Sequence, residues 1–396
     1  MNTTGTVINK EFTTLPEARL GIIPLKSMAL IGSKVDQYVV SWRKERVESG
    51  EMPPDNDYSR DTFIIESSTP RFGSGEAKGT IRQSIRGEDV YILVDVCNYS
   101  IHYQLNSHEN VMSPDDHFQD LKRIIAAIGG KAHRINVIMP YLYEGRRITR
   151  DSRESLDCAN ALQELVDLGV ENIITFDAHD PRVQNAIPLS GFECMSPSYQ
   201  FIKNILRYEK GLKLDNDHMM CVTPDVGGMA RAIYVANVLG INMGMFYKRR
   251  DYTTLIDGDN PVVAHEFLGS EVEGKDIIII DDMISSGEKV IETAKLLKSK
   301  KANRIFICAT FGILTGGVSK FDAAYDAGIF NRLITTNLVY QPGELLSRPY
   351  YTSCDMSKYL ALIIDTLNHN GSLSSLLDPV DRIHKVVAKY EAGEPI

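Results

Sequence analysis

The stretch from Ile277 to Gly287, IIIIDDMISSG, combines residue types that suit the binding of a phosphorylated sugar. Four isoleucines precede the carboxylates of Asp281 and Asp282, and two serines and a glycine follow just before a helical pattern. Backbone amides of such a loop can bind a phosphate dianion, and small residues let it approach closely. The carboxylates repel phosphate but suit sugar hydroxyls or a metal ion. The competing interpretation is a solvated acidic pair followed by a serine N-cap.

Two more polar clusters follow apolar runs. In TFDAHDPRVQ, His179 stands between Asp177 and Asp180 directly after NIITF. The flanking carboxylates make this imidazole a candidate metal ligand or phosphate contact, whereas an isolated histidine is usually an ordinary surface or core residue. In TPDVGGMAR, Asp225 precedes a glycine pair. The same pattern is also ordinary turn chemistry.

The remaining clusters offer cations and an aromatic ring. Lys248, Arg249 and Arg250 follow the apolar run INMGMFY and precede a polar stretch that reaches Glu273. Consecutive cations usually form a solvated face, but on a long loop they can close over a polyphosphate. The tract RFGSGEAK, residues 71–78, couples an aromatic ring with a carboxylate and can seat a purine, although the motif is weak.

Strands that end at a common sheet edge would bring these clusters together. Short β-branched runs alternate with helix-length stretches, which is typical of parallel sheets covered on both faces. The nine runs are FIIE, VYILVDV, INVIMPYLY, NIITFDAHD, MCVTPDVGG, INMGMFYKR, DIIIIDDM, RIFICATFG and RLITTNLV. Ligands collect beyond the carboxyl ends of parallel strands, where the polar clusters lie. Because nine strands exceed the usual ~5 to 6 of one sheet, we expect two α/β domains that meet near Pro188.

The spacing of apolar residues predicts two helices. The first carries Leu156, Ala159, Leu162 and Val166 on one face and ends at Gly169 in a left-handed cap. The second follows the acidic doublet, and its apolar face consists of Val290, Ile291, Ala294 and Leu297.

The N-terminal part of the chain changes character at residue 43. Between Arg19 and Trp42 the pattern predicts a strand and an amphipathic stretch. Residues 43–61, RKERVESGEMPPDNDYSRD, then carry charges, glycine and a proline pair without periodicity. We expect this polar tract to be a mobile loop.

Composition excludes several classes of protein. The chain has 396 residues, with 43 Lys plus Arg against 52 Asp plus Glu, and its net charge of −9 disfavours nucleic-acid and membrane-surface binding. The six cysteines are scattered singly, which indicates reduced thiols rather than zinc ligands or disulfides. No export signal opens the sequence, and no apolar run approaches the ~18 residues of a membrane span. We expect a cytoplasmic protein.

Taken in order, the clusters resemble the ribose-phosphate pyrophosphokinase (PRPP synthetase) family from about residue 19 to residue 375. The motifs are RFGSGEAKGTIRQSIRGEDVYIL, PYLYEGRRITRDSRE, DAHDPRVQ, TPDVGG, KRR and IIIIDDMISSG. The resemblance implies two tandem phosphoribosyltransferase-like α/β domains, each a mainly parallel sheet flanked by helices. These would be residues 19–188, with the polar insert 43–61, and residues 189–375, with a polar N-terminal tail at 1–18 and a C-terminal extension at 376–396.

The resemblance also implies a reaction. ATP and ribose 5-phosphate would bind with Mg²⁺, and the anomeric hydroxyl of the sugar would attack the β-phosphorus of ATP. AMP would leave, and the sugar would keep the diphosphate as PRPP. The family further implies a homo-oligomer, in which dimers stack into hexamers.

On the nucleotide side, the resemblance places Phe72 and Glu76 at the adenine. Arg146 or Arg147 would lie near the nucleotide, and the choice stays open because PYLYEGRRITR departs from the family's pattern.

Metal and transition-state roles fall on two further pairs. His179 and Asp225 would help to hold Mg²⁺–ATP. Lys248 and Arg250 would neutralise charge on the transferring diphosphoryl group, in a reaction that depends on positioning and electrostatics.

On the sugar side, Asp281 and Asp282 would hold the ribose hydroxyls. The 5-phosphate would lie against Ser285, Ser286 and Gly287. The loop departs from the family at Glu288, near a position usually held by threonine. A carboxylate aimed at the phosphate would repel it, so Glu288 must point outward or the phosphate site is weakened.

Two other functions compete with this one. A non-catalytic regulatory paralogue would keep the fold and explain the altered loop, but has no need for all four of His179, Asp225, Lys248 and Arg250. A phosphoribosyltransferase uses a similar acidic loop, but usually needs only one such domain. A nucleotide kinase of the P-loop class is disfavoured because no G-x-x-x-x-G-K-[ST] motif is present.

Overall fold

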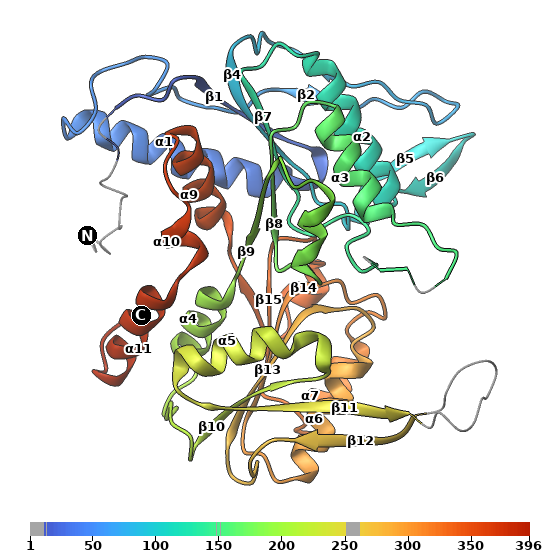
Figure 1. Ribbon diagram of the computed structural model, residues 1–396, viewed down its shortest axis with the longest axis vertical. Coiled ribbons are helices and arrows are strands. Elements are labelled where there is room, and N and C mark those ends of the chain that lie inside the picture. The colour runs from blue at the N-terminus through green and yellow to red at the C-terminus, as the bar shows by residue number, and fades with distance from the viewer. Residues whose placement is uncertain (1–11, 13, 148, 151, 251–261) are drawn as a thin grey trace. The chain divides into compact units, whose positions relative to one another are not determined.

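The computed structural model describes residue 12 and residues 14–147, 149–150, 152–250 and 262–396, with the side chains of 248–250 and 262–265 excepted. The chain forms two compact units (Figure 1). Unit 1 contains the described residues up to Met195, with Leu338–Tyr340 and Asp355–Leu377. Unit 2 contains Ser196–Asn337, Gln341–Cys354 and Asp378–Ile396. The expected second domain, 189–375, therefore differs from unit 2, because two later segments return to unit 1.

Unit 1 is built on a parallel sheet in the order β1-β4-β7-β8-β9. Its strands are β1 (Arg19–Pro24), β4 (Glu88–Leu93), β7 (Arg134–Ile138), β8 (Asn172–Phe176) and β9 (Gly191–Met195). The longer helices are α1 (Ala29–Glu48), α2 (Pro114–Ile128), α3 (Asp157–Asp167) and α9 (Ser357–Asn368), and α10 (Ser374–Leu377) is short. Every residue of β4 is buried, which agrees with the prediction of a sheet covered on both faces.

Two small antiparallel hairpins accompany this sheet. They are β2–β3 (Ser67–Ser68 and Thr80–Ile81) and β5–β6 (His102–Leu105 and His108–Val111). The predicted strand FIIE contributes only one isolated bridge, between Ile22 and Ile64.

Unit 2 is built on a larger sheet in the order β12-β11-β10-β13-β14-β15-β16. Its strands are β10 (Met219–Thr223), β11 (Asn242–Arg250), β12 (Val262–Leu268), β13 (Asp276–Ile284), β14 (Ile305–Gly312), β15 (Arg332–Thr336) and β16 (Tyr351–Cys354). The pairs are parallel except β11 with β12. The helices are α4 (Ser198–Tyr208), α5 (Met229–Leu239), α6 (Glu288–Ser299), α7 (Ser319–Asp326), α8 (Gly343–Leu346) and α11 (Val380–Glu391).

Both helices predicted from apolar spacing are confirmed. The first is α3, and Gly169 follows it with φ of 92°, but its buried residues are Cys158, Ala161, Leu162 and Leu165, so only Leu162 of the predicted apolar face is buried. The second is α6, whose Val290, Ile291, Ala294 and Leu297 are all buried. Within the described residues, no helix is both long and apolar enough to cross a bilayer.

The prediction of a mobile loop over residues 43–61 is wrong for residues 43–48. Helix α1 continues to Glu48, and the side chains of Arg43 and Arg46 are only 1% and 2% exposed. The physical reason lies far away in the sequence, because both guanidinium groups pair with Asp365 of α9.

The polar stretch expected after the run of cations is partly a strand. Strand β11 extends through Arg250, and β12 pairs antiparallel with it, so that Tyr247 lies opposite Glu266. The carboxylate of Glu266 accepts a hydrogen bond from the Tyr247 hydroxyl.

Candidate functional site

The acidic doublet lies on a central strand of the sheet in unit 2. Strand β13 is flanked by β10 and β14, and both pairings are parallel. Asp281 and Asp282 follow its four isoleucines and are 2% and 5% exposed. The predicted position beyond the apolar part of the strand is confirmed, but the acids are buried rather than solvated. Such carboxylates need partners of opposite charge or hydrogen-bond donors.

Backbone amides supply part of this compensation. Oδ1 of Asp281 accepts a hydrogen bond from the amide of Asp282 at 3.0 Å, and Oδ1 of Asp282 accepts one from the amide of Met283 at 2.9 Å. A guanidinium nitrogen of Arg231 lies 3.8 Å from Oδ2 of Asp282. Burial still raises the pKa of Asp281 to about 7; the Asp282 charge adds to this rise, and the ammonium of Lys289 opposes it.

The loop after the doublet is fixed by its neighbours. Gly287 precedes α6 with φ of 83°, and a Cβ there would lie 2.5 Å from the ring of Phe321. The carbonyl of Ser285 accepts a hydrogen bond from the amide of Thr315 at 3.0 Å. The loop thus brings Ser285, Ser286 and Gly287 to the N-terminal end of α6, where unpaired helix amides favour an anion.

Lys289, which sequence reasoning missed, joins two of the acids. Its Nζ lies 2.9 Å from Oδ2 of Asp225 and 2.6 Å from Oδ2 of Asp281. Asp225 follows β10, and its Oδ1 accepts a hydrogen bond from the amide of Gly228 at 3.3 Å. Two of the predicted acidic positions therefore surround one cation. The only sequence signal was a lysine in the first turn after the loop.

Glu288 points away from this cluster. Its carboxylate is exposed and pairs with Lys320 of α7, which lowers the pKa of Glu288. The sequence required Glu288 either to point outward or to weaken the phosphate site, and in the structure it points outward.

The predicted nucleotide residues of unit 1 lie at the surface. Phe72 and Glu76 close a tight hairpin, in which the amide of Phe72 donates to the carbonyl of Glu76 at 2.7 Å. The Phe72 side chain is 52% exposed. Arg146 and Arg147 lie in an exposed turn after β7, and Arg147 contacts Glu154 at 3.2 Å. The exposed ring and guanidinium groups can meet a ligand from solvent.

His179 follows β8, as the position of DAHD directly after NIITF predicted. Asp177 has φ of 43°, and His179 is exposed. Asp180 caps the 3₁₀ helix Pro181–Ala186 and pairs with Arg182.

The predicted catalytic cations are only partly described. Lys248 and Arg250 lie in β11 by their backbone, but their side chains fall outside the described residues.

The acids of unit 2 fit a magnesium ion. Mg²⁺ usually binds through one or two carboxylates, with waters and substrate phosphates completing its shell. Asp225 and Asp281 already lie within 3 Å of one ammonium, so both carboxylates reach a common cation. Among the residues that the structure describes, no group of three or more His, Cys, Asp or Glu is arranged to hold a metal by protein ligands alone. His179 and Asp225 belong to different units and are described separately.

Comparison with known proteins separates this chain from single-domain transferases. The profile described as the N-terminal domain of ribose phosphate pyrophosphokinase matches residues 45–169, and that of the phosphoribosyl transferase domain matches residues 198–334. The chain belongs to the ribose-phosphate pyrophosphokinase family. The family's two α/β domains, each of phosphoribosyltransferase type, correspond to the two sheets described above, as the sequence predicted.

Individual relatives agree with this family. The chain is 26% identical over 320 residues to the ribose-phosphate pyrophosphokinase of Vibrio parahaemolyticus, which covers 79% of this chain and 91% of the relative. It is 29% identical over 248 residues to that of Aquifex aeolicus, covering 62% and 71%. The crystal structure of phosphoribosylpyrophosphate synthetase from Mycobacterium smegmatis has the same fold, with a TM-score of 0.70, 19% identity, and coverage of 89% of this chain and 100% of that one.

Proposed function

We propose that this protein is a ribose-phosphate diphosphokinase, which transfers the β,γ-diphosphoryl group of ATP to the anomeric hydroxyl of ribose 5-phosphate. The observation that carries the proposal is the buried doublet in the C-terminal half of β13, followed by a loop of small residues before α6, with Asp225 and Asp281 on one ammonium. This is the arrangement that a phosphorylated sugar needs, since its hydroxyls meet carboxylates and its phosphate meets helix amides. Family membership supplies the class of reaction.

The sugar side of the reaction uses unit 2. Asp281 and Asp282 accept hydrogen bonds from the ribose hydroxyls and so orient the anomeric oxygen. Ser285, Ser286 and Gly287 bind the 5-phosphate at the N-terminus of α6. The fixed backbone of this loop limits the rearrangement needed on binding.

The nucleotide side draws on surface residues. Phe72 stacks on adenine, Glu76 accepts from its amino group, and Arg146 or Arg147 lies near the phosphates. Lys248 and Arg250 neutralise charge on the transferring group, where a poised cation contributes roughly 10³- to 10⁵-fold in related arginine-finger systems.

The proposed metal is Mg²⁺. Asp225 and Asp281 would hold it in unit 2, and His179 and Asp225 are the residues that would hold Mg²⁺–ATP. The ion would supply polarisation of the phosphoryl oxygens and stabilisation of developing negative charge. The anomeric hydroxyl oxygen forms a bond to the β-phosphorus and its proton is released to solvent, while the bond from that phosphorus to the AMP oxygen breaks and AMP leaves with the electron pair.

The test is to incubate the pure protein with ATP, Mg²⁺ and ribose 5-phosphate and to measure AMP and PRPP in equal amounts. Asp281→Asn should lower turnover by about 100-fold, as expected when reacting groups lose their alignment. Glu288→Gln is the matched control, since its side chain points outward to Lys320. We expect it to remain within a few-fold of the wild-type rate.

Two outcomes would favour the competing functions. Absence of AMP across a range of metal and phosphate concentrations would indicate a non-catalytic regulatory paralogue. Release of diphosphate from PRPP with a nucleobase would indicate a phosphoribosyltransferase. Light scattering on the same sample tests the proposed homo-oligomer, either a dimer or a hexamer.

A further inference from the structure

Lys289 lies beside the loop that is proposed to bind the sugar phosphate, but its ammonium contacts two carboxylates of the site. Its ammonium contacts the carboxylates of Asp225 and Asp281 at 2.9 and 2.6 Å. The Asp281 side chain is 3% exposed, whereas those of Asp225 and Lys289 are each 40% exposed. The ammonium therefore lies between solvent and the buried acid.

The contact with Asp281 is one of charge rather than a well-directed hydrogen bond. Oδ2 of Asp281 is buried and accepts no hydrogen bond of regular geometry within the described part of the chain, yet it lies next to Nζ of Lys289. An uncompensated buried carboxylate is strongly unfavourable, so the ammonium has an electrostatic reason to remain there. A cation of better coordinating geometry could take its place.

The local charge balance leads to the same conclusion. Among the ion pairs that join described residues, three carboxylates, those of Asp225, Asp281 and Asp282, contact two cations, Lys289 and Arg231. If a divalent ion were added while Lys289 stayed in place, the ammonium and the ion would compete for the same oxygens. The lysine stem is flexible and partly exposed, which gives the ammonium room to leave.

We propose that Lys289 is an internal counter-cation that occupies the divalent-metal position between Asp225 and Asp281, and that metal binds there only when this ammonium is displaced. The inference rests on the proposed function for the location of the metal. It goes further in assigning to Lys289 control over how tightly that metal binds. Without bound metal the lysine offsets part of the negative charge of the acidic site, and it makes metal binding weaker than the carboxylates alone would allow.

Binding of Mn²⁺ in the absence of substrates tests this directly. Free Mn²⁺ is measured by electron paramagnetic resonance during titration of the full-length protein. Lys289→Met should bind at least about tenfold more tightly than the wild type, because the competing charge is gone. Lys320→Met, which removes the neighbouring lysine that pairs with Glu288, should leave the affinity unchanged. The double variant with Asp281→Asn should lose the gain, which assigns it to this site.

Equal or weaker Mn²⁺ binding by Lys289→Met would overturn the inference. Thermal unfolding verifies that each variant is folded. If Lys289→Met fails to fold, Lys289→Gln, which keeps most of the stem, makes the same comparison. The titration does not depend on turnover. A protein that forms no AMP but shows the Mn²⁺ effect refutes the proposed reaction alone, whereas AMP formation without the effect refutes only the role of Lys289.

Discussion

At the residue scale, the site owes its shape to the short loop between β13 and α6. The acids at one end of it and Lys289 at the other meet in space because the chain reverses through Gly287. Position along an apolar strand was enough to predict the doublet. Lys289 could not be found in this way, because its partners are 64 residues away in one case and buried in the other.

The conformation of Gly287 leads to a prediction about stability. Gly287→Ala should lower the free energy of unfolding by at least about 1 to 2 kcal/mol, since a left-handed φ penalises any Cβ and this one would also meet Phe321. Urea denaturation measures the change. Gly274→Ala is the matched control, because Gly274 has φ of 77° but nothing within 4 Å of its added Cβ. Equal losses in the two variants would show that Phe321 gives way without cost.

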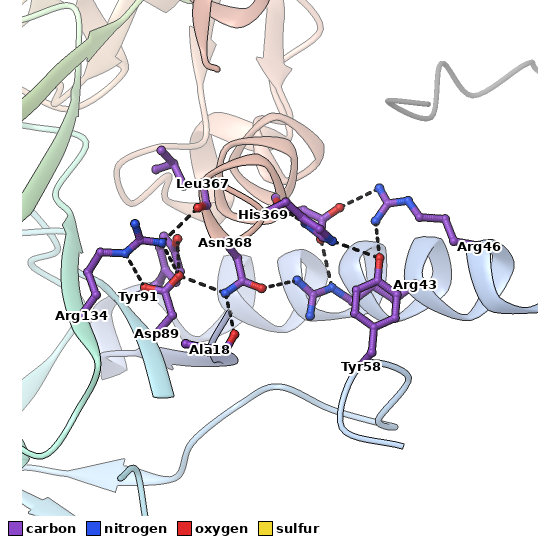
Figure 2. Close-up of polar contacts among 11 residues, drawn as sticks. Ala18, Arg43, Arg46, Tyr58, Asp89, Tyr91, Arg134, Leu367, Asn368 and His369 are labelled. Atoms are coloured by element: carbon purple, nitrogen blue, oxygen red, sulfur yellow. Dashed lines mark hydrogen bonds and ion pairs between the residues drawn. The ribbon is translucent and has the colours of Figure 1, made fainter. Parts of the chain in front are cut away.

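At the element scale, α1 and α9 are joined by a buried polar network (Figure 2). Asp365 accepts from Arg43 at 3.0 Å and from Arg46 at 2.7 Å. Asn368 accepts from Arg43 at 2.7 Å and donates to Asp89 of β4 at 2.9 Å. The network therefore ties both helices to the sheet.

Removal of the central acid should be costly. Asp365→Asn leaves two buried guanidinium groups without their counter-charge, so we expect a loss of about 3 to 5 kcal/mol in the free energy of unfolding. Lys34→Met removes the exposed pair between Lys34 and Asp355 and should cost less than about 1 kcal/mol. A loss of similar size in both variants, measured by chemical denaturation, would contradict this account.

The same network predicts a dependence of stability on pH. Burial lowers the pKa of His369 to about 4, against its ordinary value of 6.5. Between these values the unfolded chain binds a proton that the folded protein does not, so the free energy of unfolding should fall as pH drops from about 6.5 to 4. The pKa of Asp365 is lowered by Arg43 and Arg46 despite its burial, which extends the loss to lower pH.

His369→Gln isolates the histidine's part of this dependence. Urea denaturation measures the free energy of unfolding at pH 7.5 and at pH 4.5. We expect the difference between these two values to be smaller in the variant than in the wild type by up to about 3 kcal/mol. Parallel curves for the two proteins would show that other groups carry the dependence.

Helices and strands could be predicted where the sequence pattern is local. The predictions failed where residues distant in sequence determine the structure. Helices α3 and α6 follow from apolar spacing alone. The helical part of residues 43–61 did not, because charged residues without periodicity look like a loop until Asp365 pairs with them. Strand β12 was missed for a similar reason, since its partner β11 supplies the order.

At the scale of the whole molecule, each unit contains chain segments that are far apart in sequence. A fragment ending at Met195 holds the complete sheet of unit 1 but lacks α9. We expect this fragment to be unfolded or aggregated by circular dichroism and size-exclusion chromatography, because Arg43 and Arg46 would be left unpaired in an apolar setting. The same fragment joined through a flexible linker to residues 355–377 should fold. A cooperative melt of the shorter fragment would show that α9 is dispensable.

Two sheets could be predicted because alternating strands and helices are visible along the chain. The return of residues 355–377 to unit 1 could not, since the apolar face of a helix such as α9 can cover a sheet of either unit. The pairing of the α1 arginines with Asp365 helps to specify where α9 packs, and this pairing cannot be read from spacing.

The long separation between α1 and α9 sets an order of events during synthesis. Arg43 and its partner Asp365 are 322 residues apart. At ~5 to 20 residues per second, a ribosome needs roughly a quarter of a minute to a minute to make that stretch. Throughout that interval the nascent first unit carries two arginines whose counter-charge has not yet been translated. The packing of α9 onto α1 is therefore a late event in synthesis. Until then the two arginines of α1 stay accessible to chaperones.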